Sequence, residues 1–291
     1  METIAPAFPN DLAERWGIEA WTLIADTPTS HVYRVRRSDG VSAIAKLLKP
    51  AGRHELPGFH FLGWRDGAGA VKLVDRREMA GLMEDAGSTT LGEYRRHNGE
   101  AEANAIIIGI VRGLHSANVE APPPKLVPLR RQFRALFEQA AKPDGSELSH
   151  LLRICAAVAD ALIDTQTDIR PLHGDLHHEN IITGGKRGWL AIDPQGLIGD
   201  PAYEVANIFG NPRGIVLADP DLITARVRTF APAIGCHEEK ILRFAIAHAG
   251  LSVSWSIEDG EALAEGSHVR KRIDFLGMAT GLLEAGIFRA T

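Results

Sequence analysis

The stretch from residue 171 to residue 200 constrains the fold of this chain more than any other. Its sequence, PLHGDLHHENIITGGKRGWLAIDPQGLIGD, concentrates histidine, acidic and amide side chains beside two short apolar runs. Residues 172–180 show no helical or strand period, so we expect a loop there. The apolar runs 181–183 and 189–192 flank a glycine-rich turn signal, which predicts a β-hairpin. This hairpin would bring Asn180 close to Asp193.

An amide and a carboxylate brought together in this way suit a hard cation. Mg²⁺ prefers oxygen ligands and usually completes its shell with water or phosphate oxygens. Asp175 lies five residues before Asn180. In phosphoryl transfer from ATP, one carboxylate accepts the proton of the attacking hydroxyl, while an amide and a second carboxylate hold the metal. The order Asp175, Asn180, hairpin, Asp193 reproduces the layout of protein kinases, with Asp175 as the base.

The same stretch resembles the aminoglycoside phosphotransferase family. HGDLHHEN followed by IDPQGLIGDP is similar to its streptomycin 6-kinase and hydroxyurea phosphotransferase branch, where His-Gly-Asp replaces the His-Arg-Asp of protein kinases. The resemblance implies Asp175 as the catalytic base and Asn180 and Asp193 as metal ligands. It also implies that Asp200 supports the catalytic loop from the start of a helix. We assign His173 a structural role in the same loop.

Two other interpretations of these residues stay open. His173, His177 and His178 could be zinc ligands, which would make the chain a metallohydrolase. However, two of them are adjacent, and the sequence has no cysteine pair or HExxH helix to support a zinc site. Asp200-Pro201 is also an ordinary helix start, because Asp caps a helix and Pro fits its first turn.

Length and charge limit the classes of protein to which the chain can belong. With 291 residues and 45% hydrophobic content, the chain can bury a sizeable core and form two lobes. Its net charge of -5 argues against a nucleic-acid partner, which favours basic proteins. Cys155 and Cys236 have no motif spacing, so we expect no disulfide framework. Without a signal-peptide pattern or an apolar run of membrane-spanning length, we predict a cytoplasmic protein with no membrane partner.

Residues 1–85 are predicted to form a nucleotide-binding lobe with a small antiparallel sheet. A short helix is expected at 10–20, and a strand pattern starts at Trp21. Runs 31–37 and 41–48 flank an Asp-Gly pair, a strong hairpin signal because both residues tolerate positive φ. Two further runs, 71–75 and 79–83, are joined by a charged turn, which brings the sheet to four or five strands.

Lys46 stands out in this lobe because it interrupts an apolar run. A lysine among such neighbours indicates an edge strand or a side chain that snorkels to a polar surface. In a kinase-like lobe it is the phosphate-binding lysine of the third strand, which needs a carboxylate to hold it. Glu55, at the start of the stretch 54–64, is our candidate, and Glu78 is the rival, although it falls in a turn.

The remaining nucleotide contacts are expected at two connections. In the segment 26–30, the backbone N–H groups and hydroxyls of Thr29 and Ser30 could hold phosphate oxygens. No GxGxxG is present there, and an ordinary turn is the alternative. The chain should cross to the second lobe after the last strand, where the backbone of Glu84 and Ala86 could bond the adenine edge.

Residues 86–291 are predicted to form a helical catalytic and substrate-binding lobe. Apolar residues within 102–117 recur at helical spacing, which is typical of an amphipathic helix. A proline run then breaks the chain. Further helices are expected at 128–141, 151–162, 201–209, 221–230, 238–256 and 262–287.

Substrate residues are expected in the helical lobe, because Asp175 must face the acceptor hydroxyl there. Trp255, Glu258 and Asp259 are candidates, since carboxylates beside an aromatic ring suit a polyol that carries guanidinium or ammonium groups. A helix end with solvated charges and a packed ring is the alternative. Gln195, two residues after the predicted metal-ligating carboxylate, could contact the acceptor or metal-bound water.

Together these patterns predict an α+β, two-lobed protein-kinase-like fold. ATP and Mg²⁺ would bind between Lys46 and the pair Asn180 and Asp193. The resemblance implies O-phosphorylation of a hydroxylated, cationic small molecule such as streptomycin or a related aminoglycoside, and hence antibiotic resistance. Three alternatives stay open: a kinase of a non-antibiotic metabolite, an ATP-binding sensor without turnover, and the zinc hydrolase.

Overall fold

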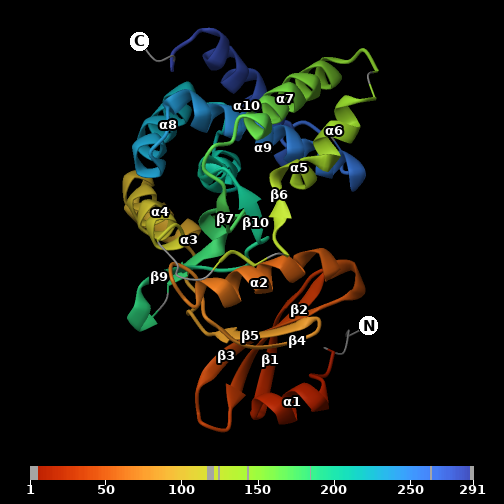
Figure 1. Cartoon of the computed structure of the whole chain (residues 1–291), viewed down its shortest axis with the longest axis vertical. Helices are drawn as coiled ribbons and strands as arrows, with labels where there is room; N and C mark the ends of the chain where they lie inside the picture. Colours follow the sequence, from red (N-terminus) through yellow and green to blue (C-terminus); the bar gives the residue numbers. More distant parts are fainter. Residues whose placement is uncertain are drawn as a thin grey trace.

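A computed structural model describes residues 6–116, 121–123, 125–142, 144–183, 185–262 and 264–288. Gly184 of the predicted turn and residues 117 and 263 of two predicted helices lie outside the described residues. The chain folds into a sheet-based N-terminal part and a larger helical part, which occupy opposite ends of the long axis (Figure 1). The described part contains no helix with the length and apolar character needed to span a membrane.

The N-terminal part is an antiparallel sheet of five strands in the order β1-β2-β3-β5-β4. One helix covers the N-terminal hairpin, and another lies between the sheet and the helical part (Figure 1). The elements are α1 (Asn10–Trp16), β1 (Ile18–Asp26), β2 (Ser30–Arg37), β3 (Ser42–Leu48), the 3₁₀ turn η1 (Pro50–Glu55), α2 (Leu56–Arg65), β4 (Leu73–Arg77) and β5 (Ala80–Glu84).

Alternation along β3 separates two cores. Side chains in a strand point to opposite faces in turn. Ala43 and Ala45 belong to a small core beneath α1. Ile44 and Leu48 pack instead against the main core. Lys46 shares the face of Ile44 and Leu48, so the strand itself directs it toward the helical part.

Most predicted strands and helices are confirmed, with differences at their ends. The predicted helix 10–20 ends at Trp16, because Gly17 adopts a left-handed φ of 63° and the chain enters β1. The predicted single helix 128–141 is split at Phe133, which has a non-helical ψ of 6°. Its fully buried ring packs edge-on against Tyr203, 5.6 Å away between centroids. Tertiary packing at Phe133 thus accompanies the break.

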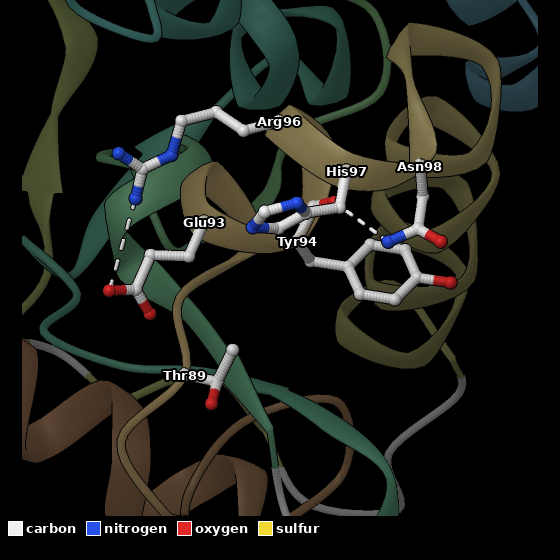
Figure 2. A pocket seen from close by; sticks show the side chains of 6 residues that line it. All are labelled: Thr89, Glu93, Tyr94, Arg96, His97 and Asn98. Atoms are coloured by element: carbon white, nitrogen blue, oxygen red, sulfur yellow. Dashed lines mark hydrogen bonds and ion pairs between the residues drawn. The ribbon is translucent and has the colours of Figure 1, made fainter.

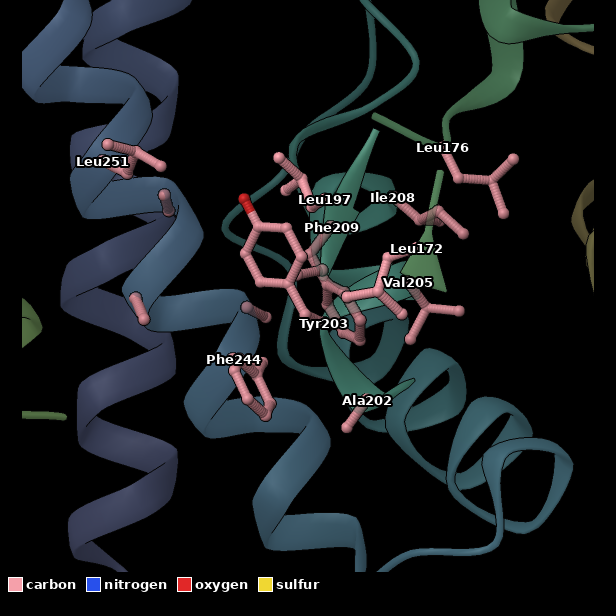
Figure 3. Close-up of a cluster of buried hydrophobic side chains, with 14 of the residues drawn as sticks. Leu172, Leu176, Leu197, Ala202, Tyr203, Val205, Ile208, Phe209, Phe244 and Leu251 are labelled. Carbon is pink, nitrogen blue, oxygen red and sulfur yellow. The ribbon is translucent and has the colours of Figure 1, made fainter. Parts of the chain in front are cut away.

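The helical part is built around one central helix, α9, which is buried along most of its length. It packs against η4, α7 and α10. Figure 3 shows side chains of η4, among them Tyr203 and Phe209, beside Phe244 and Leu251 of α9. The helices are α3 (Leu91–Asn98), α4 (Glu100–Leu114), α5 (Leu129–Gln132), α6 (Arg134–Ala140), α7 (Glu147–Asp164), the 3₁₀ helix η4 (Pro201–Gly210), α8 (Pro220–Ile234), α9 (Glu238–Glu258) and α10 (His268–Glu284).

Short strands position the stretch 171–200 between the two parts of the molecule. One small sheet has the order β6-β10-β7, and a separate hairpin pairs β8 with β9. These strands are β6 (Val127–Pro128), β7 (Arg170–Leu172), β8 (Ile181–Thr183), β9 (Trp189–Ala191) and β10 (Leu197–Gly199).

Candidate active site

The predicted hairpin is confirmed, and it brings Asn180 and Asp193 together. In its register Ile181 pairs with Ala191. One step further, the Ile192 N–H donates to the Asn180 carbonyl oxygen at 2.9 Å. Asp193 follows directly and has a positive φ of 58°. Such a backbone is uncommon outside glycine and often marks a functional site.

Asp175 is held through both of its carboxylate oxygens. Its Oδ2 accepts a hydrogen bond from Asn180 Nδ2 at 3.0 Å. Its Oδ1 accepts one from Asn207 Nδ2 at 2.7 Å. The side chain stays 29% exposed, so an acceptor can reach it. Asn180 Nδ2 also donates to the Asp175 carbonyl at 2.9 Å. Within the described part of the chain the Asn180 Oδ1 accepts no hydrogen bond, so it can ligate a cation.

The surroundings of Asp175 suit a general base. Burial raises the pKa of Asp175 to about 7, and the nearby charge of Asp193 adds to the rise. The hydrogen bonds from Asn207 and Asn180 and the positive charge of Arg272 act in the opposite direction. A base works best when its pKa lies near the operating pH.

His173 connects the catalytic loop to the chain that enters Asp193. Its imidazole is fully buried. Its Nε2 donates to the Ile192 carbonyl at 2.8 Å, and its Nδ1 accepts from the Asp175 N–H at 3.3 Å. Burial lowers the pKa of His173, so the ring is neutral. With both nitrogens bonded, the ring fits a structural role and has no lone pair for zinc.

The buried carboxylate of Glu204 holds the backbone of the catalytic loop through hydrogen bonds. It accepts hydrogen bonds from the backbone N–H groups of His173 and Gly174, both at 3.0 Å. It also accepts one from His115 Nε2 at 3.1 Å. Burial alone would raise the pKa of Glu204, but these hydrogen bonds and charges hold it below its ordinary value. The sequence signal for this residue is a glutamate inside an apolar run. Such a glutamate becomes buried, and buried glutamates are found with hydrogen-bonding or ionic partners.

Of the two interpretations of Asp200, its contacts show the ordinary helix start. Its Oδ1 caps its own helix by accepting from the Ala202 N–H at 3.0 Å. Its other oxygen forms an ion pair with Lys240 at the start of α9. In the described part of the chain, no hydrogen bond or ion pair joins Asp200 to the catalytic loop. An N-cap side chain points to its own helix, so the loop is supported one turn later, by Glu204.

Lys46 bridges the two parts of the molecule. It is buried, and its Nζ lies 2.6 Å from Glu55 Oε2 and forms an ion pair with Asp193. Burial alone would lower the pKa of Lys46, but the charges and hydrogen bonds of Asp193 and Glu55 raise it. Glu78, the rival partner, lies in the turn before β5 with a φ of 47°.

The two other predicted nucleotide contacts are partly occupied by the protein. The hydroxyl of Thr27 accepts from the Ser30 N–H at 2.9 Å and from the Thr29 N–H at 3.3 Å. These donors close the β1–β2 turn, so they are not free for phosphate. At the crossing between the lobes, the Glu84 N–H donates to the Lys72 carbonyl at 3.0 Å. Ala86 follows, buried, on the same connection.

A polar chain links two of the predicted substrate residues. Gln195 Oε1 accepts a hydrogen bond from Gln132, whose side chain also interacts with the Tyr203 hydroxyl. The Tyr203 hydroxyl and His248 Nδ1 lie 3.0 Å apart in a hydrogen bond. The His248 ring meets the edge of Trp255, with centroids 6.3 Å apart. The sequence indicated the two ends of this chain but missed its three middle residues.

The side chains of the predicted acidic substrate residues take no part in this chain. Glu258 and Asp259 are exposed at the end of α9. The Asp259 N–H donates to the Trp255 carbonyl at 2.9 Å, but among the described residues no side-chain hydrogen bond or ion pair joins Glu258 or Asp259 to another predicted site residue. The charge that acts on Asp175 from the helical part is instead the positive charge of Arg272, which also interacts with Arg213. No motif in the sequence indicated either arginine.

Two further observations concern metal-binding groups and a surface hollow. In the described ranges, no group of three or more His, Cys, Asp and Glu side chains is placed to hold a metal. A surface hollow of about 330 Å³ lies on α3 (Figure 2), and none of its lining residues is a predicted site residue. They are Thr89, Glu93, Tyr94, Arg96, His97 and Asn98.

Comparison with known proteins decides the family. Residues 15–260 match the model of a family described as aminoglycoside/hydroxyurea antibiotic resistance kinase. The chain belongs to this family. It is 36% identical over 255 residues to streptomycin 3''-kinase of Klebsiella pneumoniae, an alignment that covers 84% of this chain and 92% of that protein. It is 31% identical to hydroxyurea phosphotransferase of Kitasatospora aureofaciens, over 86% of this chain and 73% of that protein.

Solved structures confirm the predicted two-lobed, protein-kinase-like fold. Choline kinase LicA from Streptococcus pneumoniae superposes with a TM-score of 0.63 at 14% identity, covering 94% of this chain and 96% of that one. Aminoglycoside phosphotransferase APH(4)-Ia gives 0.61 at 14% identity, covering 95% and 97%. Family membership confirms the predicted branch and the enzyme class, a phosphotransferase with an alcohol group as acceptor, which uses a nucleotide.

Proposed function

We propose that this kinase transfers the terminal phosphoryl group of ATP, with Mg²⁺, to a hydroxyl of streptomycin or a related aminoglycoside. One observation carries the proposal. The exposed edge of Asp175, the amide oxygen of Asn180 and the carboxylate of Asp193 lie together, and Asp193 forms an ion pair with the buried Lys46. This is the donor set that phosphoryl transfer needs, because catalysis consists of positioning the reactants and stabilising charge.

Each residue has a role in this proposal. Lys46, held by Glu55, contacts the phosphates. Asn180 Oδ1 and Asp193 hold Mg²⁺, and an amide oxygen with one carboxylate fits a hard cation that takes its other oxygens from phosphate and water. When bound, the ion neutralises charge on the phosphates. Asp175 takes the hydroxyl proton as the hydroxyl oxygen bonds to the transferred phosphorus and ADP leaves.

The nucleotide would lie between two lobes that we place at residues 1–85 and 86–291. The adenine would reach the backbone of the connection at Glu84 and Ala86. The β1–β2 turn, with Thr29 and Ser30, would cover the phosphates mainly by shape, because its N–H groups are bonded to Thr27.

The acceptor is inferred from the relatives and from the polar chain between Gln195 and Trp255. Besides the 3''-kinase, streptomycin 6-kinase of Streptomyces glaucescens is 29% identical to this chain over 270 residues. Gln195 and Trp255 stand at the two ends of the polar chain and would line the acceptor. Glu258 and Asp259, exposed beyond them, would meet outlying cationic groups. Antibiotic resistance is the biological role that this acceptor implies.

The test is ADP formation by the purified protein with ATP and Mg²⁺, with and without streptomycin. We expect streptomycin-dependent turnover and a product that mass spectrometry identifies as phosphorylated streptomycin. Hydroxyurea, choline and a fructosamine serve as other acceptors. Turnover with one of these alone would make the protein a kinase of a different small molecule. Nucleotide binding without turnover on the whole panel would make it an ATP sensor.

A further inference from the structure

We propose that Asn207 is a positioning residue that fixes the carboxylate of Asp175 for proton transfer, and that Asn211 and Arg226 hold Asn207 in the one orientation that can do this. The inference rests on the proposed function, since it concerns the same catalytic carboxylate. It assigns a role to residues outside the loop that carries the family motif.

The carboxylate of Asp175 is fixed from two separate elements. Asn180, in the loop itself, donates to Oδ2 at 3.0 Å, and Asn207, in η4, donates to Oδ1 at 2.7 Å. Rotation of the carboxylate about its Cβ–Cγ bond would break both hydrogen bonds. Each oxygen accepts one donor and keeps a second lone pair, so the acceptor hydroxyl meets an oxygen in a fixed direction. Small displacements of a catalytic group cost rate steeply, which makes such fixation useful.

The amide of Asn207 can act as a donor only if it does not flip. Its Oδ1 accepts from Asn211 Nδ2 at 3.0 Å, and the same Nδ2 donates to the Asn207 carbonyl at 2.9 Å. A flipped amide would turn its oxygen toward the Asp175 carboxylate and its nitrogen toward the Asn211 nitrogen, which is unfavourable at both ends. Asn207 and Asn211 are 8% and 7% exposed, so little water can reach them to replace these hydrogen bonds.

Arg226 anchors this pair to the rest of the helical part. The guanidinium is buried, and its Nη1 donates to the carbonyls of Ile208 at 2.6 Å and Asn211 at 2.8 Å. Its Nε donates to Glu100 at 2.7 Å, and Glu100 also forms an ion pair with Arg95. The end of η4 is thereby tied to α8 and α4, and the position of Asp175 depends on elements far from it in sequence.

The experiment compares Asn207→Ala with Asn104→Ala in the full-length protein. Asn104 is a matched control, because it is an asparagine of similar burial, 5% exposed, in α4. We expect Asn207→Ala to lower kcat about 10- to 100-fold, the effect of losing one hydrogen bond to a charged group. Its KM for ATP should change by less than about threefold, because the lost contact acts on the acceptor side. Asn104→Ala should keep the wild-type kcat.

Asn211→Ala keeps the Asn207 side chain but frees its amide to flip, so we expect a smaller loss of kcat with an unchanged KM for ATP. It also replaces Asn207→Ala as the deciding variant if that protein does not fold. A folded Asn207→Ala enzyme with the kcat of Asn104→Ala would overturn the positioning role while leaving the proposed function intact. Absence of turnover in the wild-type protein with every acceptor would instead overturn the proposed function, and the positioning role with it.

Discussion

Replacing Glu204 with glutamine tests how the catalytic loop is held. The carboxylate accepts three hydrogen bonds, from the N–H groups of His173 and Gly174 and from His115. Glutamine has the same shape but one acceptor oxygen, so its NH₂ group must face at least one of these donors. A hydrogen bond to a charged group contributes about 1.5–3 kcal/mol, and a buried donor left unpaired costs about 1–3 kcal/mol.

From these contributions we expect Glu204→Gln to lower the free energy of unfolding by on the order of 3 kcal/mol. For a chain of this size, each kcal/mol lowers Tm by about 2–4 °C, so a fall of roughly 6–12 °C follows. Because His173 and Gly174 directly precede Asp175, kcat should also fall, by about tenfold or more. Thermal unfolding followed by circular dichroism and steady-state ADP formation measure the two effects.

Glu138→Gln is the control, since it makes the same chemical change in an exposed pair with Arg134 at 2.7 Å. Exposed pairs at this helical spacing contribute about 0.3–0.5 kcal/mol. If Glu204→Gln shifted Tm and kcat no more than Glu138→Gln does, the hydrogen bonds of Glu204 would not be what holds the loop.

Two further changes have defined outcomes. Lys46→Met removes the cation between Glu55 and Asp193; kcat should fall about 10²- to 10³-fold, as when other charge-stabilising donors are lost, while the KM of the acceptor stays near its original value. Burial lowers the pKa of His248 to about 3, so the folded state keeps it neutral while the unfolded chain binds a proton below about pH 6.5. Stability is therefore full above about pH 6.5 and is lost by up to about 1.4 kcal/mol per unit as the pH falls toward 3. His248→Gln can still bond Tyr203 and should flatten this loss between pH 6 and 5 in denaturation curves; a parallel pH dependence would contradict the assignment.

Local signals in the sequence predicted the elements that local chemistry controls. The hairpin that joins Asn180 to Asp193 follows from two short apolar runs around a glycine-rich turn. The lysine that interrupts an apolar run, Lys46, is directed by strand alternation to the face opposite its small-core neighbours. The predicted kinase-like fold and family followed from the same short segments.

Features that depend on tertiary packing could not be predicted from local sequence signals. The break at Phe133 coincides with its packing on Tyr203, which is distant in sequence. Glu204 and Asn207 form hydrogen bonds with a loop about thirty residues earlier in the sequence, and only folding brings them into contact with it. No local pattern indicated Arg272 either, although its positive charge acts on Asp175 in the folded chain.

The most direct test of the central claim is streptomycin-dependent ADP formation by the wild-type protein and by Asp175→Asn, with ATP binding measured in parallel. Asparagine keeps the size of the side chain but cannot accept the hydroxyl proton. We predict that Asp175→Asn binds ATP as the wild type does and loses about 10²- to 10⁴-fold in kcat, the contribution of a positioned base. Undiminished turnover in Asp175→Asn would contradict the account, because the carboxylate around which the site is built would then not take part in the transfer.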